Sequence, residues 1–174
     1  PTFLPLLYQQ GLSKFMDTKV INIVLGHILH WRSLGLSIPT ISINLNSDFL
    51  ADKKAVQRLL QQTAEHGILF NFEITGQSNP DQSQEIAWII KSLRAAGHRI
   101  TIDNFGTDQV ALRALVDLDA DEIKLNRDAV NTSQDKMTRS YRLLKKTTQL
   151  FHDLGFVVVT EGINTKDQLW QAQN

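Results

Sequence analysis

Five short apolar runs alternate with segments of helical periodicity along the chain, and each run ends in a polar residue of a kind that does chemistry. Alternation of strands with helices predicts a parallel sheet or a barrel. In a closed barrel the carboxyl ends of the strands form one rim, where catalytic and metal-binding groups gather. The residues that end the five runs are Asn44, Glu73, Asp103, Lys124 and Glu161. Carboxylate and amide oxygens beside a lysine on one rim predict a Mg²⁺-dependent site.

The spacing of apolar residues divides the chain into strands and helices. Strands are predicted at 41–45, 69–74, 99–103, 121–125 and 156–160. Helices are predicted at 17–34, 52–66, 81–96, 109–117 and 134–154. Asp17 is expected to cap the first helix, and His98 to interact with the dipole at a helix C-terminus. Trp31, Trp88 and Trp170 fall on apolar helix faces and are expected in the core.

Length and composition narrow the class of protein. The 174 residues suffice for one core and contain no linker-like segment, so we expect a single domain. The net charge is zero, which argues against a broad basic surface and so against DNA or RNA as a partner. There is no cysteine, and no apolar run approaches the roughly 18–20 residues of a transmembrane helix. We expect a cytoplasmic protein, or the cytoplasmic part of a membrane-anchored one.

Several stretches resemble the EAL domain of bacterial cyclic di-GMP phosphodiesterases. FLPLLYQQGL at 3–12 resembles the family's FIPLAEETGL, ISINLN at 41–46 its SVNLS, and FEIT at 72–75 its ELTE. The stretch 100–130 resembles the family segment that contains DDFGTG and then K-I-D. VVVTEGINTKDQL at 157–169 resembles its AEGVET segment followed by EEQL. The order and spacing hold over nearly the whole chain, so the combination is specific.

The resemblance implies an α/β fold, a modified (β/α)₈ barrel of the TIM type. Five strands are too few for eight, and a whole barrel usually needs about 250 residues. We therefore expect residues 1–174 to form a single EAL-like domain that is a fragment of the family barrel, incomplete in this chain. The implied reaction is hydrolysis of one phosphodiester bond of cyclic di-GMP, giving pGpG, with two Mg²⁺ or Mn²⁺ ions.

Site residues are implied by position in the family motifs. Asn44, Glu73 and Asp103 match metal ligands. Lys124 matches the lysine that assists the nucleophilic water, and Glu161 matches a carboxylate of the metal and water network. The loop residues Phe105, Gly106 and Thr107 match those that shape the turn after the metal-binding strand.

The chain also departs from the family pattern. The Glu-Ala-Leu signature and the terminal Q-G-Y-x-F-S-K-P segment are absent. Asn104 replaces a metal-binding aspartate, so a second ion would bind more weakly through an uncharged amide. Gly76 replaces a loop-bracing glutamate, and Asp108 replaces a loop glycine. Asn126 and Asn164 replace further acids, and Asn164 is a candidate substrate contact. We expect a degenerate domain with weak or absent hydrolysis.

Three functions remain open. The first is a regulatory domain that binds cyclic di-GMP without turnover, or that binds a protein partner such as a flanking sensor or GGDEF-type domain. The second is an active Mg²⁺- or Mn²⁺-dependent phosphodiesterase. The third, by fold analogy alone, is a Mg²⁺-assisted lyase or isomerase with Lys124 as base. A homodimer formed near the 103–108 loop, as in the family, also stays open.

Plainer structural roles compete with these assignments. Glu73 and Asp103 could cap helix N-termini, which is a common use of acidic side chains. Lys124 could pair with Glu161 or Asp103 only to neutralise a buried charge. Asn104 could keep the loop shape through hydrogen bonds alone.

Overall fold

The computed structural model describes residues 4–75, 83–105, 119–125, 139–166 and 168–169. Within them the strands are β1 (Ile41–Leu45), β2 (Phe70–Thr75), β3 (Arg99–Phe105), β4 (Glu122–Leu125) and β5 (Val157–Thr160). The helices are α1 (Leu4–Gln9), α2 (Ser13–Ser33), α3 (Ser47–Leu50), α4 (Lys53–His66), α5 (Ser83–Ala95) and α8 (Arg139–Asp153). The predicted helix at 109–117 lies outside the described residues.

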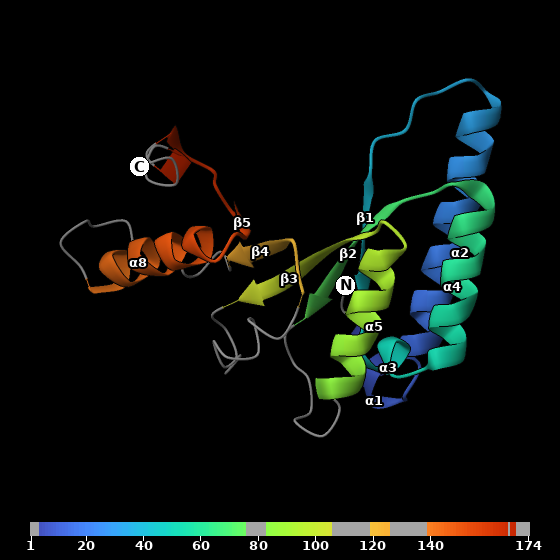
Figure 1. Cartoon of the computed structure of the whole chain (residues 1–174), viewed down its shortest axis with the longest axis horizontal. Coiled ribbons are helices and arrows are strands. Elements are labelled where there is room, and N and C mark those ends of the chain that lie inside the picture. Colours follow the sequence, from blue (N-terminus) through green and yellow to red (C-terminus); the bar gives the residue numbers. More distant parts are fainter. Residues whose placement is uncertain (1–3, 76–82, 106–118, 126–138, 167, 170–174) are drawn as a thin grey trace.

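The strands form one parallel sheet in the order β1-β2-β3-β4-β5. Each crossover therefore moves one strand further in the same direction, without the reversal of order that marks a doubly wound sheet. Figure 1 shows α2, α4 and α5 grouped near β1 and β2, with α8 near β4 and β5. The α/β class and the parallel sheet predicted from the sequence are confirmed.

Strand alternation gives the sheet one apolar face and one polar face. The apolar face packs on the helices and carries the buried side chains Ile43, Leu45, Phe70, Phe72, Ile74, Ile100, Ile102, Ile123 and Leu125. Its partners include Ile28 of α2, Leu59 of α4 and Ile90 of α5, and Phe151 of α8 further along the sheet. The residues predicted to form the rim lie on the opposite face.

Helix α4 shows how local sequence sets an element's ends. The carboxylate of Asp52 accepts hydrogen bonds from the backbone N–H groups of Lys54 (3.0 Å) and Ala55 (3.1 Å), as expected of an N-cap. Gly67 ends the helix with φ of 56°, in the left-handed region that glycine adopts without a steric cost. The chain then turns directly into β2.

The predicted role of Asp17 as a helix cap is wrong. Helix α2 begins at Ser13, so Asp17 lies inside it, and its carboxylate is buried. Asp17 sits one helical turn before Ile21, on the face that packs inward. The carboxylate is used in a long-range contact with the loop after β1, which is described below.

Two tryptophans predicted in the core are exposed. Trp31 of α2 lies beyond the buried face formed by Ile21, Leu25 and Ile28, and its ring stacks on His27 with 5.5 Å between centroids. Trp88 of α5 is also exposed. Helical spacing predicts an apolar stripe along the helix, but it does not predict which edge of that stripe packs against the sheet. Trp170 lies outside the described residues.

His98 is a core residue and not the helix-terminal residue that was predicted. Helix α5 ends at Ala95, and the His98 ring is buried before β3. Its Nδ1 accepts a hydrogen bond from the Phe70 N–H (3.2 Å), so the ring hydrogen sits on Nε2, 3.1 Å from the Thr63 hydroxyl oxygen. Burial lowers the pKa of His98 to about 4, which keeps the ring neutral.

Candidate active site

The strand register brings the predicted rim residues to one edge of the sheet. Asn44 is the Cα partner of Glu73 across β1 and β2. In β3 and β4, Ile102 partners Ile123 and Phe105 partners Leu125, with a register shift between the two pairs. Asp103 and Lys124 lie within this irregular stretch, and their charged groups are 3.7 Å apart. Glu161 comes directly after β5, two residues beyond the strand partner of Lys124. Residues far apart in sequence therefore converge at the carboxyl ends of the strands.

Lys124 is the centre of this group. Its Nζ lies 3.0 Å from Oε2 of Glu73, 2.5 Å from Oε1 of Glu161 and 3.7 Å from Oδ1 of Asp103. The side chains of Lys124, Glu73 and Asp103 are 13 %, 14 % and 12 % exposed, whereas that of Glu161 is 46 % exposed. We call these four residues the rim cluster. Its closed side is formed by β2, β3 and β4, and its open side by Glu161.

The electrostatics of the rim cluster favour a charged lysine. Burial alone would lower the pKa of Lys124, but hydrogen bonds to Glu161 and Glu73 and the charge of Asp103 raise it above its ordinary value. Three carboxylates surround one ammonium, so the cluster keeps a net negative charge. A negatively charged cluster attracts a cation, and it repels a phosphate that has no cation bound to it.

The donor chemistry of the rim suits a hard divalent cation, because carboxylate and amide oxygens are the ligands that Mg²⁺ prefers. Across the described ranges, however, no three His, Asp or Glu side chains are grouped so as to enclose a metal ion. The ammonium of Lys124 contacts all three carboxylates of the cluster. A cation would have to draw at least one of those carboxylates away from the lysine.

The other predicted site residues are not part of the rim cluster. Asn44 is exposed beside Glu73. Asn104 and Phe105 belong to β3, and nothing of their side chains is described. Gly106 and Thr107 lie outside the described residues, as do Gly76, Asp108 and Asn126.

Asn164 takes part in a local turn. Its side-chain amide donates to the Gly162 carbonyl (3.1 Å), and its backbone N–H donates to Oε1 of Gln168 (2.7 Å). Gln168 also accepts from the Thr165 N–H (3.0 Å), while its own N–H donates to the Thr165 hydroxyl (3.2 Å). This reciprocal pair is a capping box, so Asn164 is fixed at the start of a helical turn beyond Glu161.

Sequence reasoning missed the contact that anchors the end of β1. The Asp17 carboxylate accepts hydrogen bonds from the Asn46 backbone N–H (2.9 Å) and from its side-chain amide (2.8 and 3.0 Å). Burial raises the pKa of Asp17, and the hydrogen bonds from Asn46 only partly offset it. Ser13 of the same helix donates to Asp48. These contacts tie α2 to Asn46, which lies between β1 and α3, and to Asp48 of α3. The sequence did hold one indication of this contact, because Asp17 lies one helical turn before Ile21 and so on the buried face of the helix.

The chain belongs to the EAL domain family, whose model matches residues 1–174. It is 31% identical over 179 residues to a probable cyclic di-GMP phosphodiesterase, PdeB of Escherichia coli K12, with 99% of this chain and 33% of that protein covered. It is 29% identical to the oxygen sensor protein DosP of the same bacterium, covering 95% of this chain and 21% of that protein. The chain thus spans about a fifth to a third of the length of these relatives.

Solved structures agree on the fold. The chain is similar to the PaMucR phosphodiesterase in complex with c-di-GMP, with a TM-score of 0.85 and 24% identity over 99% of this chain and 76% of that one. It is also similar to Vibrio cholerae LapD S helix-GGDEF-EAL, bound to c-di-GMP, with a TM-score of 0.79 and 20% identity over 96% of this chain and 40% of that one. For Klebsiella pneumoniae BlrP1, a calcium and c-di-GMP complex, the TM-score is 0.76 and the identity is 23% over 94% of this chain and 41% of that one. The fold of this chain is therefore that of the EAL domain.

No helix within the described ranges combines the length and the apolar character needed to cross a bilayer.

Proposed function

We propose that this domain binds cyclic di-GMP at the rim cluster, with a divalent cation, and hydrolyses it slowly or not at all. This proposal is based on the contacts of Lys124 with Glu73, Asp103 and Glu161 at the carboxyl ends of the strands. Solved structures that share the fold are complexes with c-di-GMP, which supports this nucleotide as the ligand. The absence of cysteine is consistent with a cytoplasmic location.

Mg²⁺ or Mn²⁺ fits the donor set of the rim, and calcium and manganese complexes of a relative support this choice. Glu73, Asp103 and Asn44 would hold the ion. The ion would supply a Lewis acid for the phosphate oxygens and a more acidic bound water. In this chain Lys124 keeps its hydrogen bonds to Glu73 and Glu161, and its raised pKa suits it to orient a negatively charged group and not to act as a free base.

Slow hydrolysis is inferred from the charge that the sequence lacks. Asn104 and Asn126 stand where the family has aspartates, and Gly76 stands where it has a glutamate. Each ~1.4 kcal/mol of lost transition-state stabilisation lowers a rate tenfold, and removal of one electrostatic group can cost several kcal/mol. Binding needs fewer of these groups than turnover, so the domain retains nucleotide binding when hydrolysis is slow or lost.

An active phosphodiesterase is the second candidate. It is favoured by the same cluster, because Glu73, Asp103, Lys124 and Glu161 are all present and in contact. A role in recruiting a flanking sensor or GGDEF-type domain is compatible with either candidate, and LapD, a GGDEF-EAL protein, shares the fold. No observation favours the lyase or isomerase alternative.

Turnover separates the two candidates. The full-length protein is incubated with cyclic di-GMP and Mn²⁺, and the products are resolved by chromatography. We expect little or no pGpG over hours at micromolar protein, together with calorimetric binding of the nucleotide in Ca²⁺. Rapid formation of pGpG that is lost in E73Q would establish the active enzyme. Absence of binding in every cation would reject the nucleotide site itself.

A further inference from the structure

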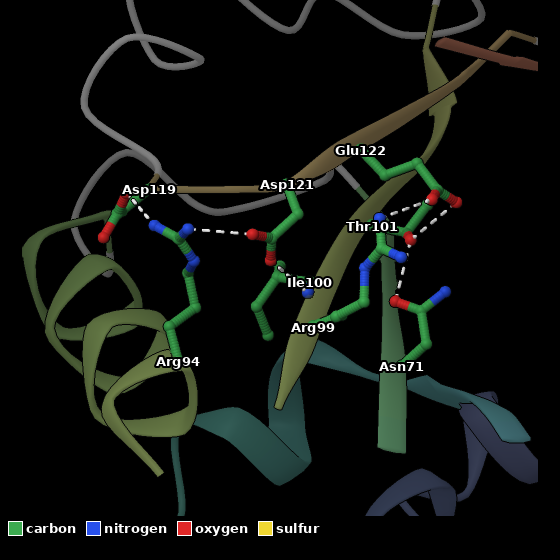
Figure 2. A network of polar contacts seen from close by, with 8 residues as sticks. All are labelled: Asn71, Arg94, Arg99, Ile100, Thr101, Asp119, Asp121 and Glu122. Carbon is green, nitrogen blue, oxygen red and sulfur yellow. Dashed lines mark hydrogen bonds and ion pairs between the residues drawn. The ribbon is translucent and has the colours of Figure 1, made fainter. Parts of the chain in front are cut away.

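A second row of polar side chains lies beneath the rim cluster on the same face of the sheet. Figure 2 shows part of it, with Thr101 between Asn71 and Glu122. The Thr101 hydroxyl oxygen lies 3.0 Å from Oδ1 of Asn71 and 3.2 Å from Oε1 of Glu122. Asn71 in turn donates to the Ser42 hydroxyl (3.2 Å), and Arg99 donates to the other Glu122 oxygen (3.4 Å). The row thus crosses from β1 to β4.

Each member of this row stands two residues before a rim residue on the same strand. Ser42 precedes Asn44, Asn71 precedes Glu73, Thr101 precedes Asp103 and Glu122 precedes Lys124. Because side chains two apart on a strand point to the same face, the row and the rim form adjacent layers. The row fixes the lateral spacing of the strands one layer below the rim cluster.

Thr101 is the centre of the row. It is the Cα partner of Glu73 on one side and of Glu122 on the other, and it is fully buried. Its one hydroxyl hydrogen can go to either acceptor, and both are within hydrogen-bonding distance. A buried acceptor deprived of its donor is costly, so the hydroxyl holds Asn71 and Glu122 close to β3.

We infer that Thr101 is a positioning residue, whose hydroxyl holds β2 and β4 against β3 so that Lys124 reaches Glu73 across the strand between them. The contact it supports is the 3.0 Å pair of Lys124 and Glu73. Its importance for cyclic di-GMP rests on the proposed function, whereas its effect on the Lys124 contact does not.

The first test measures Lys124 without any ligand. Acylation of each lysine by an amine-reactive probe at one fixed pH is followed by mass spectrometry in the full-length protein. T101V keeps the β-branched shape but loses the hydroxyl, and T101S keeps the hydroxyl. We expect Lys124 to be acylated about fivefold faster in T101V than in the wild type, because the contribution of one neutral hydrogen bond corresponds to a factor of about five. In T101S the rate should match that of the wild type. Lys53, paired on the surface with Glu85, should label equally in all forms.

A matched control separates positioning from general loss of stability. T63V removes another buried threonine hydroxyl, the one beside His98 in the core on the opposite face of the sheet. We expect T63V to lower the unfolding midpoint, as T101V does, without faster labelling of Lys124. Equal labelling of Lys124 in T101V and the wild type would overturn the inference, and so would faster labelling in T63V.

The second measurement concerns the nucleotide. Calorimetry with Ca²⁺ and cyclic di-GMP should show weaker binding in T101V than in T101S, by a similar factor of about five. If the wild type binds no nucleotide, the proposed function fails, and the labelling result still decides the positioning role. If the wild type binds and T101V binds equally well, Thr101 does not position the site for its ligand.

Discussion

Lys124 Nζ lies 3.0 Å from Oε2 of Glu73, although the two residues are 51 positions apart in the sequence and β3 runs between their strands. The pair spans the sheet at the end of β3, where Asp103 contributes the third charge. The contact exists only when the three strands are in register. The rim cluster is therefore a property of the folded sheet, and its charges should report on both stability and ligand binding.

Replacing Lys124 with methionine should destabilise the fold. Three carboxylates would face one another without the ammonium, and removal of one partner from a largely buried ion pair costs about 3 kcal/mol. Chemical denaturation measures the change. Added Mg²⁺ should restore part of the lost free energy of unfolding, because the cation then neutralises the same oxygens. K53M is the control, because the pair of Lys53 and Glu85 is exposed and such pairs contribute below about 1 kcal/mol. Equal losses in K124M and K53M would contradict the assigned burial.

His98 should make the protein sensitive to mild acid. Its folded-state pKa of about 4 lies below the ordinary value of 6.5, so the unfolded chain takes up the proton first. The stabilisation is complete above pH 6.5 and is lost as pH falls toward 4, to a total of about 3 kcal/mol. H98Q should flatten this part of the profile of unfolding free energy against pH, whereas replacing the exposed His30 should not. An unchanged slope in H98Q would show that other groups dominate.

Arg94 should anchor the loop before β4. Its guanidinium donates to Asp119 and, at 2.8 Å, to Oδ1 of Asp121, whose other oxygen accepts from the Ile100 N–H at 2.9 Å (Figure 2). R94M should lower the free energy of unfolding by about 1–2 kcal/mol, a modest value because the side chain is partly exposed. R94K should recover only part, because an ammonium cannot reproduce the planar fork. Full recovery by lysine would show that charge alone matters.

Asp17 should stabilise the loop after β1. D17A leaves the backbone N–H and the side-chain amide of Asn46 without their acceptor, at a cost of about 2 kcal/mol in the free energy of unfolding. N22A, at an exposed position of the same helix, is the control and should stay within about 0.5 kcal/mol. If D17A unfolds at the same denaturant concentration as N22A, the contact with Asn46 contributes nothing.

The strands could be predicted from the sequence because their apolar alternation is local. The strand at 41–45 agrees with β1 at both ends, and the others differ by one or two residues. The rim residues followed from their position at strand ends together with the family motifs. The sequence could not show that Lys124 would contact Glu73, Asp103 and Glu161 together, since that depends on register across four strands.

Three features that the sequence did not predict are long-range polar contacts. Asp17 meets Asn46 across 29 positions, His98 meets Thr63 across 35, and Thr101 meets Asn71 across 30. In each case a polar residue lies in a buried layer and is satisfied by a partner from another element. Local periodicity treats such a residue as a cap or an interruption, because the partner that makes its burial favourable is invisible until the sheet is assembled.

We propose that the rim cluster binds cyclic di-GMP together with a divalent cation. Calorimetric titration of cyclic di-GMP into the full-length protein in Ca²⁺, and again in EDTA, tests it most directly. We predict saturable binding in Ca²⁺ that weakens in EDTA and falls at least about tenfold, or ~1.4 kcal/mol, in D103N. Binding that is unchanged by both EDTA and D103N, or no binding at all, would show that the rim cluster is not a cation-dependent nucleotide site.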